Sequence, residues 1–228
     1  IEGPNGDLDW IGSWEDSFDL LPEIDTCVLG GRMYPGYERY WLAVLANPEG
    51  ILPLTGQVPA RGEVEYARFA DKTRHVVLSR TLDKVAWKTA RIVRDVEDIR
   101  ALKQQPGKHI HAVGGASLVS TLMNEGLVDE VRLTVHPVVL GSGKALFSNV
   151  ERRHPLELVE TRRLVAGRVG LIYNVAAADQ PRVRRPHAGL LERAPRGEEV
   201  LLLALDLARA KPRRRPQRIV AEVGEQSK

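Results

Sequence analysis

Apolar residues along the chain fall into two kinds of pattern, which alternate. Stretches with apolar residues at the spacing typical of strands cover residues 24–29, 75–79, 89–93, 110–113 and 128–139. Between them, apolar residues recur at helical spacing in residues 13–21, 37–45, 62–73, 96–103 and 118–123. Two β-rich stretches, residues 156–164 and 167–175, follow each other closely enough for an antiparallel hairpin. This alternation of strands and helices predicts an α/β domain with a mostly parallel sheet.

One turn in this pattern suggests a binding site. The apolar run 110–113 stops at Gly114 and Gly115 and passes directly into the helical pattern of residues 118–123. Glycines without side chains allow another molecule's backbone or phosphate to approach the turn closely. The first amides of the following helix, with the positive end of its dipole, favour an anion there. We expect Ser117 to add a hydroxyl at or near the N-cap.

The sequence around this turn resembles a known family. Residues 113–147, VGGASLVSTLMNEGLVDEVRLTVHPVVLGSGKALF, resemble the C-terminal signature of the dihydrofolate reductase superfamily. The resemblance is to the branch that contains the riboflavin-biosynthesis (RibD) C-terminal reductase domain. It implies a three-layer α/β/α dihydrofolate reductase-like fold, with a mostly parallel central sheet and a C-terminal antiparallel hairpin. It also implies NADPH as cofactor, a small-molecule substrate and a homodimer, to which residues 131–139 and 171–175 contribute.

The resemblance also assigns cofactor-binding residues. Three turns are implied to hold NADPH, and their residues are Gly30, Gly31, Arg32 and Met33, then Ser79 and Arg80, and last Gly114, Gly115, Ala116, Ser117 and Leu118. The first turn resembles the reductases' Gly-Arg-x-Thr-Tyr turn, with Met33 where threonine is usual. The second is where the family reads the 2′-phosphate of NADPH, and a guanidinium suits a dianionic phosphate. Arg32 and Arg80 have a plainer alternative as ordinary solvated arginines.

The catalytic residues are less well defined by the sequence. By its position in the family, the helix 13–21 lies beside the substrate, which makes Asp16 and Asp19 candidate proton donors or water-orienting groups. Either aspartate has the plainer explanation of a solvated helix charge. We therefore expect an NADPH-dependent reductase that transfers a hydride to a heterocyclic, imine or carbonyl substrate. The alternative is a non-catalytic nucleotide-binding or interaction module with a reductase-like fold.

The two ends of the chain differ from this pattern. In the family, a strand in the middle of the sheet precedes the loop at residues 1–12, and we expect this strand to be absent from the present fold. We assign residues 1–175 to the reductase-like domain, with its first strand missing. Residues 176–228 hold 12 Lys and Arg against 7 Asp and Glu and are rich in proline, so we expect a mobile basic extension outside the fold. We expect no nucleic-acid partner except through this basic tail, and the tail lacks the interleaved aromatic residues of single-strand binders.

Composition excludes several other classes. Cys27 is the only cysteine, so a disulfide within the chain and a cysteine-rich zinc site are both ruled out. His109, His111, His136 and His154 show no metal-binding helical spacing, and we expect no metal site. The chain has no apolar run of membrane-spanning length and no signal-peptide pattern, which predicts a soluble cytoplasmic protein without a membrane partner.

Overall fold

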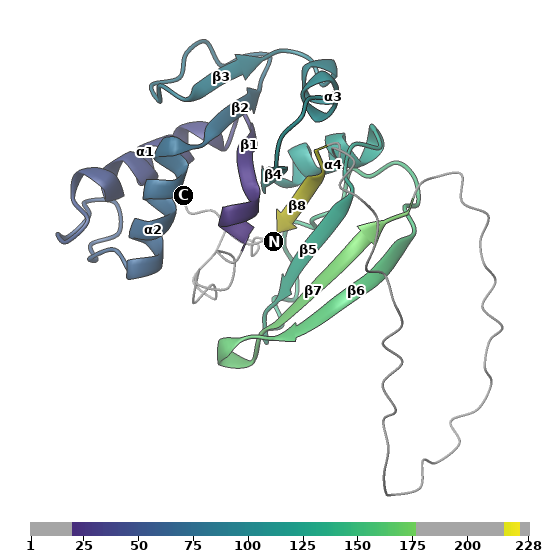
Figure 1. Ribbon diagram of the computed structural model, residues 1–228. Helices are drawn as coiled ribbons and strands as arrows, with labels where there is room; N and C mark the ends of the chain where they lie inside the picture. The colour runs from purple at the N-terminus through teal and green to yellow at the C-terminus, as the bar shows by residue number, and fades with distance from the viewer. Residues whose placement is uncertain (1–19, 177–216, 224–228) are drawn as a thin grey trace, which may run out of the picture.

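The computed structural model describes residues 20–176 and 217–223, and these form one α/β unit built on an eight-stranded sheet. The strand order is β3-β2-β1-β4-β8-β5-β7-β6, as Figure 1 shows. The six strands from β3 to β5 pair in parallel, whereas β7 and β6 pair antiparallel at the end of the sheet. The predicted fold class, a mostly parallel sheet with a C-terminal antiparallel hairpin, is therefore confirmed.

The elements lie close to where the apolar pattern places them. The strands are β1 (Ile24–Gly30), β2 (Arg74–Leu78), β3 (Ala90–Val93), β4 (His109–Gly114), β5 (Glu130–Val135), β6 (Leu156–Arg163), β7 (Val169–Val175) and β8 (Ile219–Val223). The helices are α1 (Tyr34–Ala46), α2 (Arg61–Lys72), α3 (Glu97–Lys103) and α4 (Ala116–Asn124). The expected strand 128–139 is shorter than predicted, because Pro137 has no amide to donate and Val138 N–H donates to His136 O in a tight local turn, 2.9 Å.

Two hydrophobic cores cover the two faces of the sheet, which gives three layers. On one face, α1 and α2 pack aromatic residues against β1 and β2, among them Tyr37, Trp41 and Tyr66. On the other face, α3 and α4 pack aliphatic residues such as Ile99, Leu118 and Leu122 against β1, β4 and β5. The strands β1 and β4 are buried on both faces, which explains the consecutive apolar residues at positions 27–29 and 112–113.

The aromatic core contains a buried polar cluster around His75. Tyr37 Oη lies 3.1 Å from His75 Nε2 and 3.2 Å from Tyr66 Oη, while His75 Nδ1 lies 2.9 Å from Thr73 O. The ring of His75 also stacks on Trp87, with 4.8 Å between ring centroids. Burial lowers the pKa of His75 to about 4, so the imidazole is neutral inside the fold at neutral pH.

Strand β8 corrects the predicted domain boundary. The prediction places residues 176–228 outside the fold, yet Ile219–Val223 is a central strand of the sheet. It pairs with β4 on one edge and with β5 on the other, so it joins these two strands in the middle of the sheet (Figure 1). The β-branched pair Ile219-Val220 followed by Ala221 is a strand signal, but the surrounding arginines and prolines obscure it.

Candidate functional site

The candidate site lies where the connections of the sheet change direction. From β1 the chain passes to α1 on one face, and from the neighbouring β4 it passes to α4 on the other face. Ligands of open α/β sheets bind at such a switch point, outside the carboxyl ends of the strands. The carboxyl ends of β1 and β4 are Gly30 and Gly114, so the two glycine turns singled out by the sequence flank this position.

The turn after β1 packs directly against the other two predicted turns. Gly31 N–H donates to Leu78 O at the end of β2, 3.0 Å, and a Cβ added to Gly31 would meet Ser79 Oγ and Cβ at less than 3.0 Å. A Cβ on Gly30 would lie 3.7 Å from Leu118 Cβ, and one on Gly114 would lie 4.0 Å from Met33 Sδ. The structure thus brings all three predicted cofactor turns together at one edge of the sheet.

The turn after β4 presents the N-terminus of α4 at this edge. Gly115 is the N-cap residue with φ 85°, a conformation that favours glycine, and its carbonyl accepts from Val119 N–H, 3.1 Å. Ser117 is therefore in the first turn of the helix, two residues after the N-cap, which agrees with its expected place near the helix start. The amides of Ala116, Ser117 and Leu118 have no acceptor within the helix, as in every helical first turn. Ser117 is exposed at this end, whereas Ala116 and Leu118 are buried.

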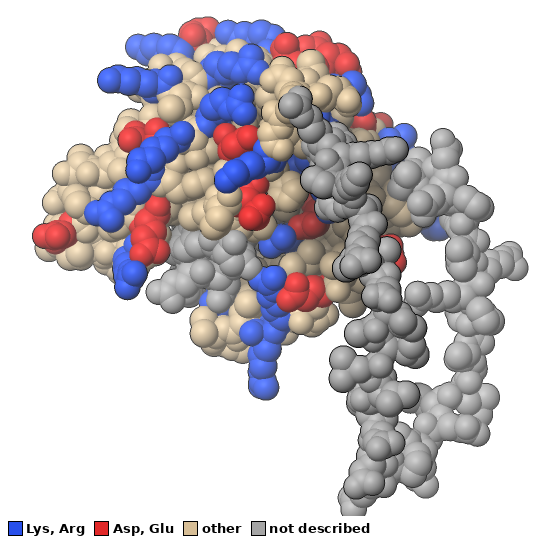
Figure 2. All heavy atoms as spheres, in the orientation of Figure 1, with Lys and Arg blue, Asp and Glu red and all other residues tan. Residues whose placement is uncertain are grey.

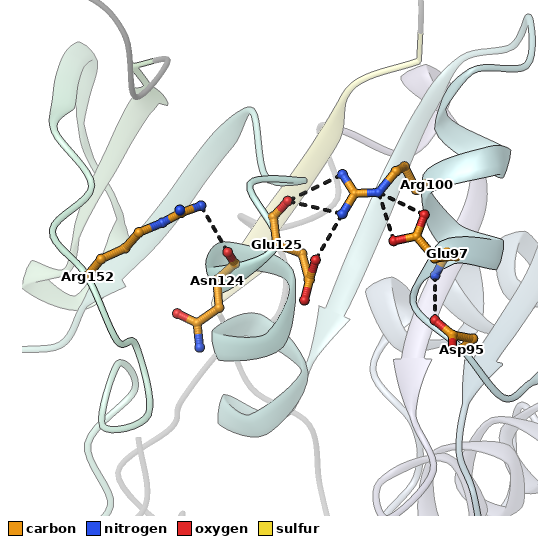
Figure 3. A network of polar contacts seen from close by, with 6 residues as sticks. All are labelled: Asp95, Glu97, Arg100, Asn124, Glu125 and Arg152. Carbon is orange, nitrogen blue, oxygen red and sulfur yellow. Dashed lines mark hydrogen bonds and ion pairs between the residues drawn. The ribbon is translucent and has the colours of Figure 1, made fainter.

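The opposite end of α4 is held by two arginines. Arg100 on α3 donates to Glu125 O, 3.4 Å, and forms an ion pair with Glu125 Oε2, 2.9 Å. Arg152 Nη2 donates to Asn124 O, 2.9 Å, and Figure 3 shows the two guanidinium groups approaching the helix end from opposite sides. Cations at a helix C-terminus are favourable because they complement the dipole and satisfy terminal carbonyls. These contacts fix α4 and leave its N-terminal amides at the candidate site.

The turn after β2 is held in place by Ser79 and Arg94. Ser79 Oγ accepts from Thr81 N–H, 3.3 Å, and from Leu82 N–H, 3.0 Å. Arg94 Nη1 donates to Ser79 O, 2.7 Å, and to Leu82 O, 2.8 Å. Because the Ser79 hydroxyl accepts in both bonds, its own hydrogen remains available for a ligand. These four hydrogen bonds hold the loop that carries Arg80 in place after β2.

Glu38 on α1 fixes the rest of this loop. Its Oε1 accepts from Ala86 N–H and Trp87 N–H, each at 2.8 Å, and from Tyr34 Oη at 2.6 Å. Burial of Tyr34, together with its hydrogen bond to Glu38, raises the pKa of the phenol, so Tyr34 stays a donor at physiological pH. Sequence reasoning missed the roles of Glu38 and Arg94, because their partners are backbone groups distant in sequence.

Two exposed arginines lie beside these turns. Arg32 follows the glycine turn of β1, and Arg80 follows Ser79; neither forms an ion pair with a carboxylate in the part of the chain that the structure describes. Among the described residues, no carboxylate competes with a ligand for either guanidinium. Asp16 and Asp19, the candidate catalytic residues, lie outside the described residues. The structure thus brings together the predicted cofactor residues and does not place the predicted proton donors.

Other kinds of site find less support in the structure. Within residues 20–176 and 217–223, no group of three or more His, Cys, Asp and Glu side chains is placed to hold a metal ion. None of the helices in these ranges is long and apolar enough to cross a membrane. On the face shown in Figure 2, Lys and Arg side chains are mixed with Asp and Glu and do not form a continuous basic surface. Cys27 is fully buried, and burial raises its pKa, so its thiol is unreactive.

The fold defines an α/β protein with two glycine turns and two helix N-termini at the switch point of its sheet. Comparison with known proteins gives the family. The model of the RibD C-terminal domain matches residues 46–169, which is more than half of the chain. The chain belongs to this reductase-like family.

Two relatives from Bacillus subtilis (strain 168) extend this assignment. The protein YyaP is 37% identical over 177 residues, covering 76% of this chain and 87% of YyaP. The protein YwjB is 30% identical over 172 residues, covering 72% of this chain and 84% of YwjB. Both alignments span most of the relative, so the similarity concerns the whole domain.

A solved structure agrees with the fold. The crystal structure of a protein from Shewanella sp. PV-4, named for riboflavin biosynthesis, superimposes with a TM-score of 0.54 at 19% identity. The match covers 78% of this chain and 92% of the Shewanella chain. This similarity supports the architecture described above.

Proposed function

We propose that the protein is an NADPH-dependent reductase that acts on a C=N or C=O group of a small planar heterocycle. One observation carries the proposal. Three turns from β1, β2 and β4 contact one another at the carboxyl edge of the sheet, beside two helix N-termini and two exposed arginines that pair with no carboxylate of the described residues. Membership of a reductase-like family supports the reaction class.

Each turn has a separate part in the proposal. The free amides of Ala116, Ser117 and Leu118 bind the pyrophosphate at the positive end of the α4 dipole. Arg32 and Arg80 bind the 2′-phosphate, for which the hydroxyl of Ser79 is a further donor. When bound, NADPH supplies the hydride, while the chain orients the cofactor and excludes competing reactions.

The proposal predicts a preference for NADPH over NADH that depends on Arg80. The 2′-phosphate adds a charge of nearly two, and a hydrogen bond to a charged group contributes about 1.5 to 3 kcal/mol. Arg80→Ala should therefore weaken NADPH binding about ten- to a hundredfold and leave NADH binding almost unchanged. Binding is measured by calorimetric titration of both dinucleotides with the full chain.

A matched arginine variant controls for general loss of charge. Arg68 is also exposed, but it lies on α2, so Arg68→Ala should change the affinity for neither dinucleotide. Equal losses for NADPH and NADH in Arg80→Ala would show that Arg80 does not read the phosphate. Binding without turnover of any heterocyclic, imine or carbonyl substrate would favour a non-catalytic nucleotide-binding module instead.

The proposal includes a homodimer formed through the antiparallel end of the sheet. In that region large apolar side chains are exposed, and they are Val135, Val138, Val139, Leu156, Leu158 and Val159. A group of exposed apolar residues on and beside an edge strand needs a partner to keep it from water and from further strand pairing. Val131, which the family resemblance assigns to this interface, lies fully buried in the chain's own core.

A further inference from the structure

Strand β8 joins the two halves of the sheet, although it is far from its neighbours in sequence. It lies between β4 and β5, which have no direct pairing with each other, so it alone connects the parallel strands β3, β2, β1 and β4 to the strands β5, β7 and β6. Residues 177–216 separate it from the preceding described strand, β7. A central position of this kind requires pairing on both edges and packing on both faces.

The packing of β8 meets both requirements. Ile219, Val220 and Ala221 are 0%, 1% and 0% exposed. Val220 belongs to the aromatic core under α1 and α2, whereas Ile219 and Ala221 belong to the aliphatic core under α3 and α4. Ala221 pairs with Ala112 on β4 and with Val131 on β5, so no larger side chain fits there without displacing a core residue.

Backbone and side-chain bonds fix the register at the start of the strand. Ile110 N–H donates to Arg218 O, 2.8 Å, and Asp129 N–H donates to Ile219 O, 3.0 Å. Ile219 N–H in turn donates to Asp129 Oδ2, 2.8 Å, and Arg218 Nη2 donates to Asn174 Oδ1, 2.8 Å. Gln217, 1% exposed, donates from Nε2 to Asp25 Oδ1, 3.4 Å. All these partners are at least 44 positions away in sequence.

We propose that the groove between β4 and β5 is a binding site for a parallel β-strand, and that residues 217–223 occupy it through non-covalent contacts alone. A separate peptide with the same sequence therefore competes with residues 217–223 for this position when the protein refolds. Its backbone supplies the affinity through pairing on both edges, as in recognition by strand addition. Its side chains supply the specificity, because the groove takes large aliphatic residues at positions 219 and 220 and only a small one at position 221.

The test cuts the connection in the otherwise intact protein. A recognition site for a sequence-specific protease replaces residues 190–196 of the full chain, which is then cleaved under native conditions. We expect the C-terminal fragment to co-elute with the folded body in gel filtration. When the cut protein is unfolded in urea and refolded with an excess of labelled peptide 212–228, the label should enter the folded protein in proportion to that excess.

A matched pair of variants separates binding in the groove from attachment elsewhere. Ala221→Asp places a carboxylate at a fully buried position between β4 and β5, so the cut fragment should dissociate from the body. Gln226→Asp adds the same charge after the end of β8, so the cut fragment should stay bound. If the Ala221→Asp protein does not fold before cleavage, hydrogen exchange in the uncut wild-type chain tests instead whether residues 219–221 are held between β4 and β5. The amides of residues 219–221 should then be as protected as those of β4.

Three results would overturn the proposal. One is a wild-type fragment that separates from a body that stays folded, or a body that aggregates on cleavage. Another is a refolded protein without label. A third is retention of the Ala221→Asp fragment together with rapid exchange of the amides of residues 219–221.

Discussion

Two neighbouring glycines in the turn after β1 should respond very differently to alanine. A Cβ on Gly31 would lie less than 3.0 Å from Ser79 Oγ and Cβ and 3.3 Å from Ser79 Cα, while one on Gly30 would make an ordinary 3.7 Å contact with Leu118. Neither glycine has a positive φ, so backbone strain does not enter. Gly31→Ala therefore tests how tightly the turns of β1 and β2 pack at the candidate site.

The magnitude follows from two opposing effects. Replacing glycine by alanine stabilises a fold by about 0.4 to 1 kcal/mol through the unfolded chain, where the native conformation allows it. Overpacking a filled site costs about 1 to 3 kcal/mol. We expect Gly30→Ala to be neutral or slightly stabilising in urea denaturation, and Gly31→Ala to lower the free energy of unfolding by about 1 to 2 kcal/mol. Gly31→Ala should also weaken NADPH binding, because the turn moves away from Ser79.

A double-mutant cycle locates the cause. Ser79→Gly removes the Oγ and Cβ atoms that the new methyl group would meet, so the cost of Gly31→Ala should be smaller in that background, with a coupling of about 0.5 to 3 kcal/mol. Equal stabilities of the Gly30→Ala and Gly31→Ala proteins, or a coupling near zero, would refute this account of the packing.

Two other predictions concern stability at low pH and assembly. His75 has its pKa lowered to about 4 by burial, from 6.5, so the fold should lose about 3 kcal/mol as the pH falls from 6.5 to 4, and His75→Gln should flatten the urea-unfolding profile in that window. A wild-type profile as flat as that of the variant would contradict this assignment. Leu158, 54% exposed on β6, should lie in the dimer interface, so Leu158→Asp should shift sedimentation from a dimer to a 25.3 kDa monomer. A wild-type protein that sediments as a monomer would reject the dimer.

Local sequence pattern predicts most of the fold because each buried strand contains consecutive or alternating apolar residues and each helix has an apolar face. It also predicts the two glycine turns, since a glycine pair directly between a strand and a helix is typical of a tight turn that a ligand can approach. The pattern misses β8, whose burial depends entirely on partners distant in sequence. Glu38 and Arg94 are missed for a related reason, because each organises a loop through backbone groups that carry no residue-specific signal.

The N-cap of α4 shows how backbone geometry can decide a position that side-chain preference would give to a serine. A serine near the start of a helix is often the N-cap, but here Gly115 takes that position because its positive φ joins β4 directly to α4. Whether Gly115 or Ser117 is the N-cap therefore depends on the path of the backbone and not on the side chain. With Gly115 as the N-cap, the free amides at the start of α4 are those of Ala116, Ser117 and Leu118.

The most direct test of the proposed site is NMR of the ¹⁵N-labelled full chain titrated with NADPH. If the dinucleotide binds at the switch point, the largest amide shifts should occur at Gly31, Arg80, Gly115 and Ser117, which belong to three separate turns at one edge of the sheet. NADH should reproduce the shifts at Gly115 and Ser117 but not the shift at Arg80. Shifts confined to β6 and β7, or no shifts at saturating NADPH, would contradict the central claim.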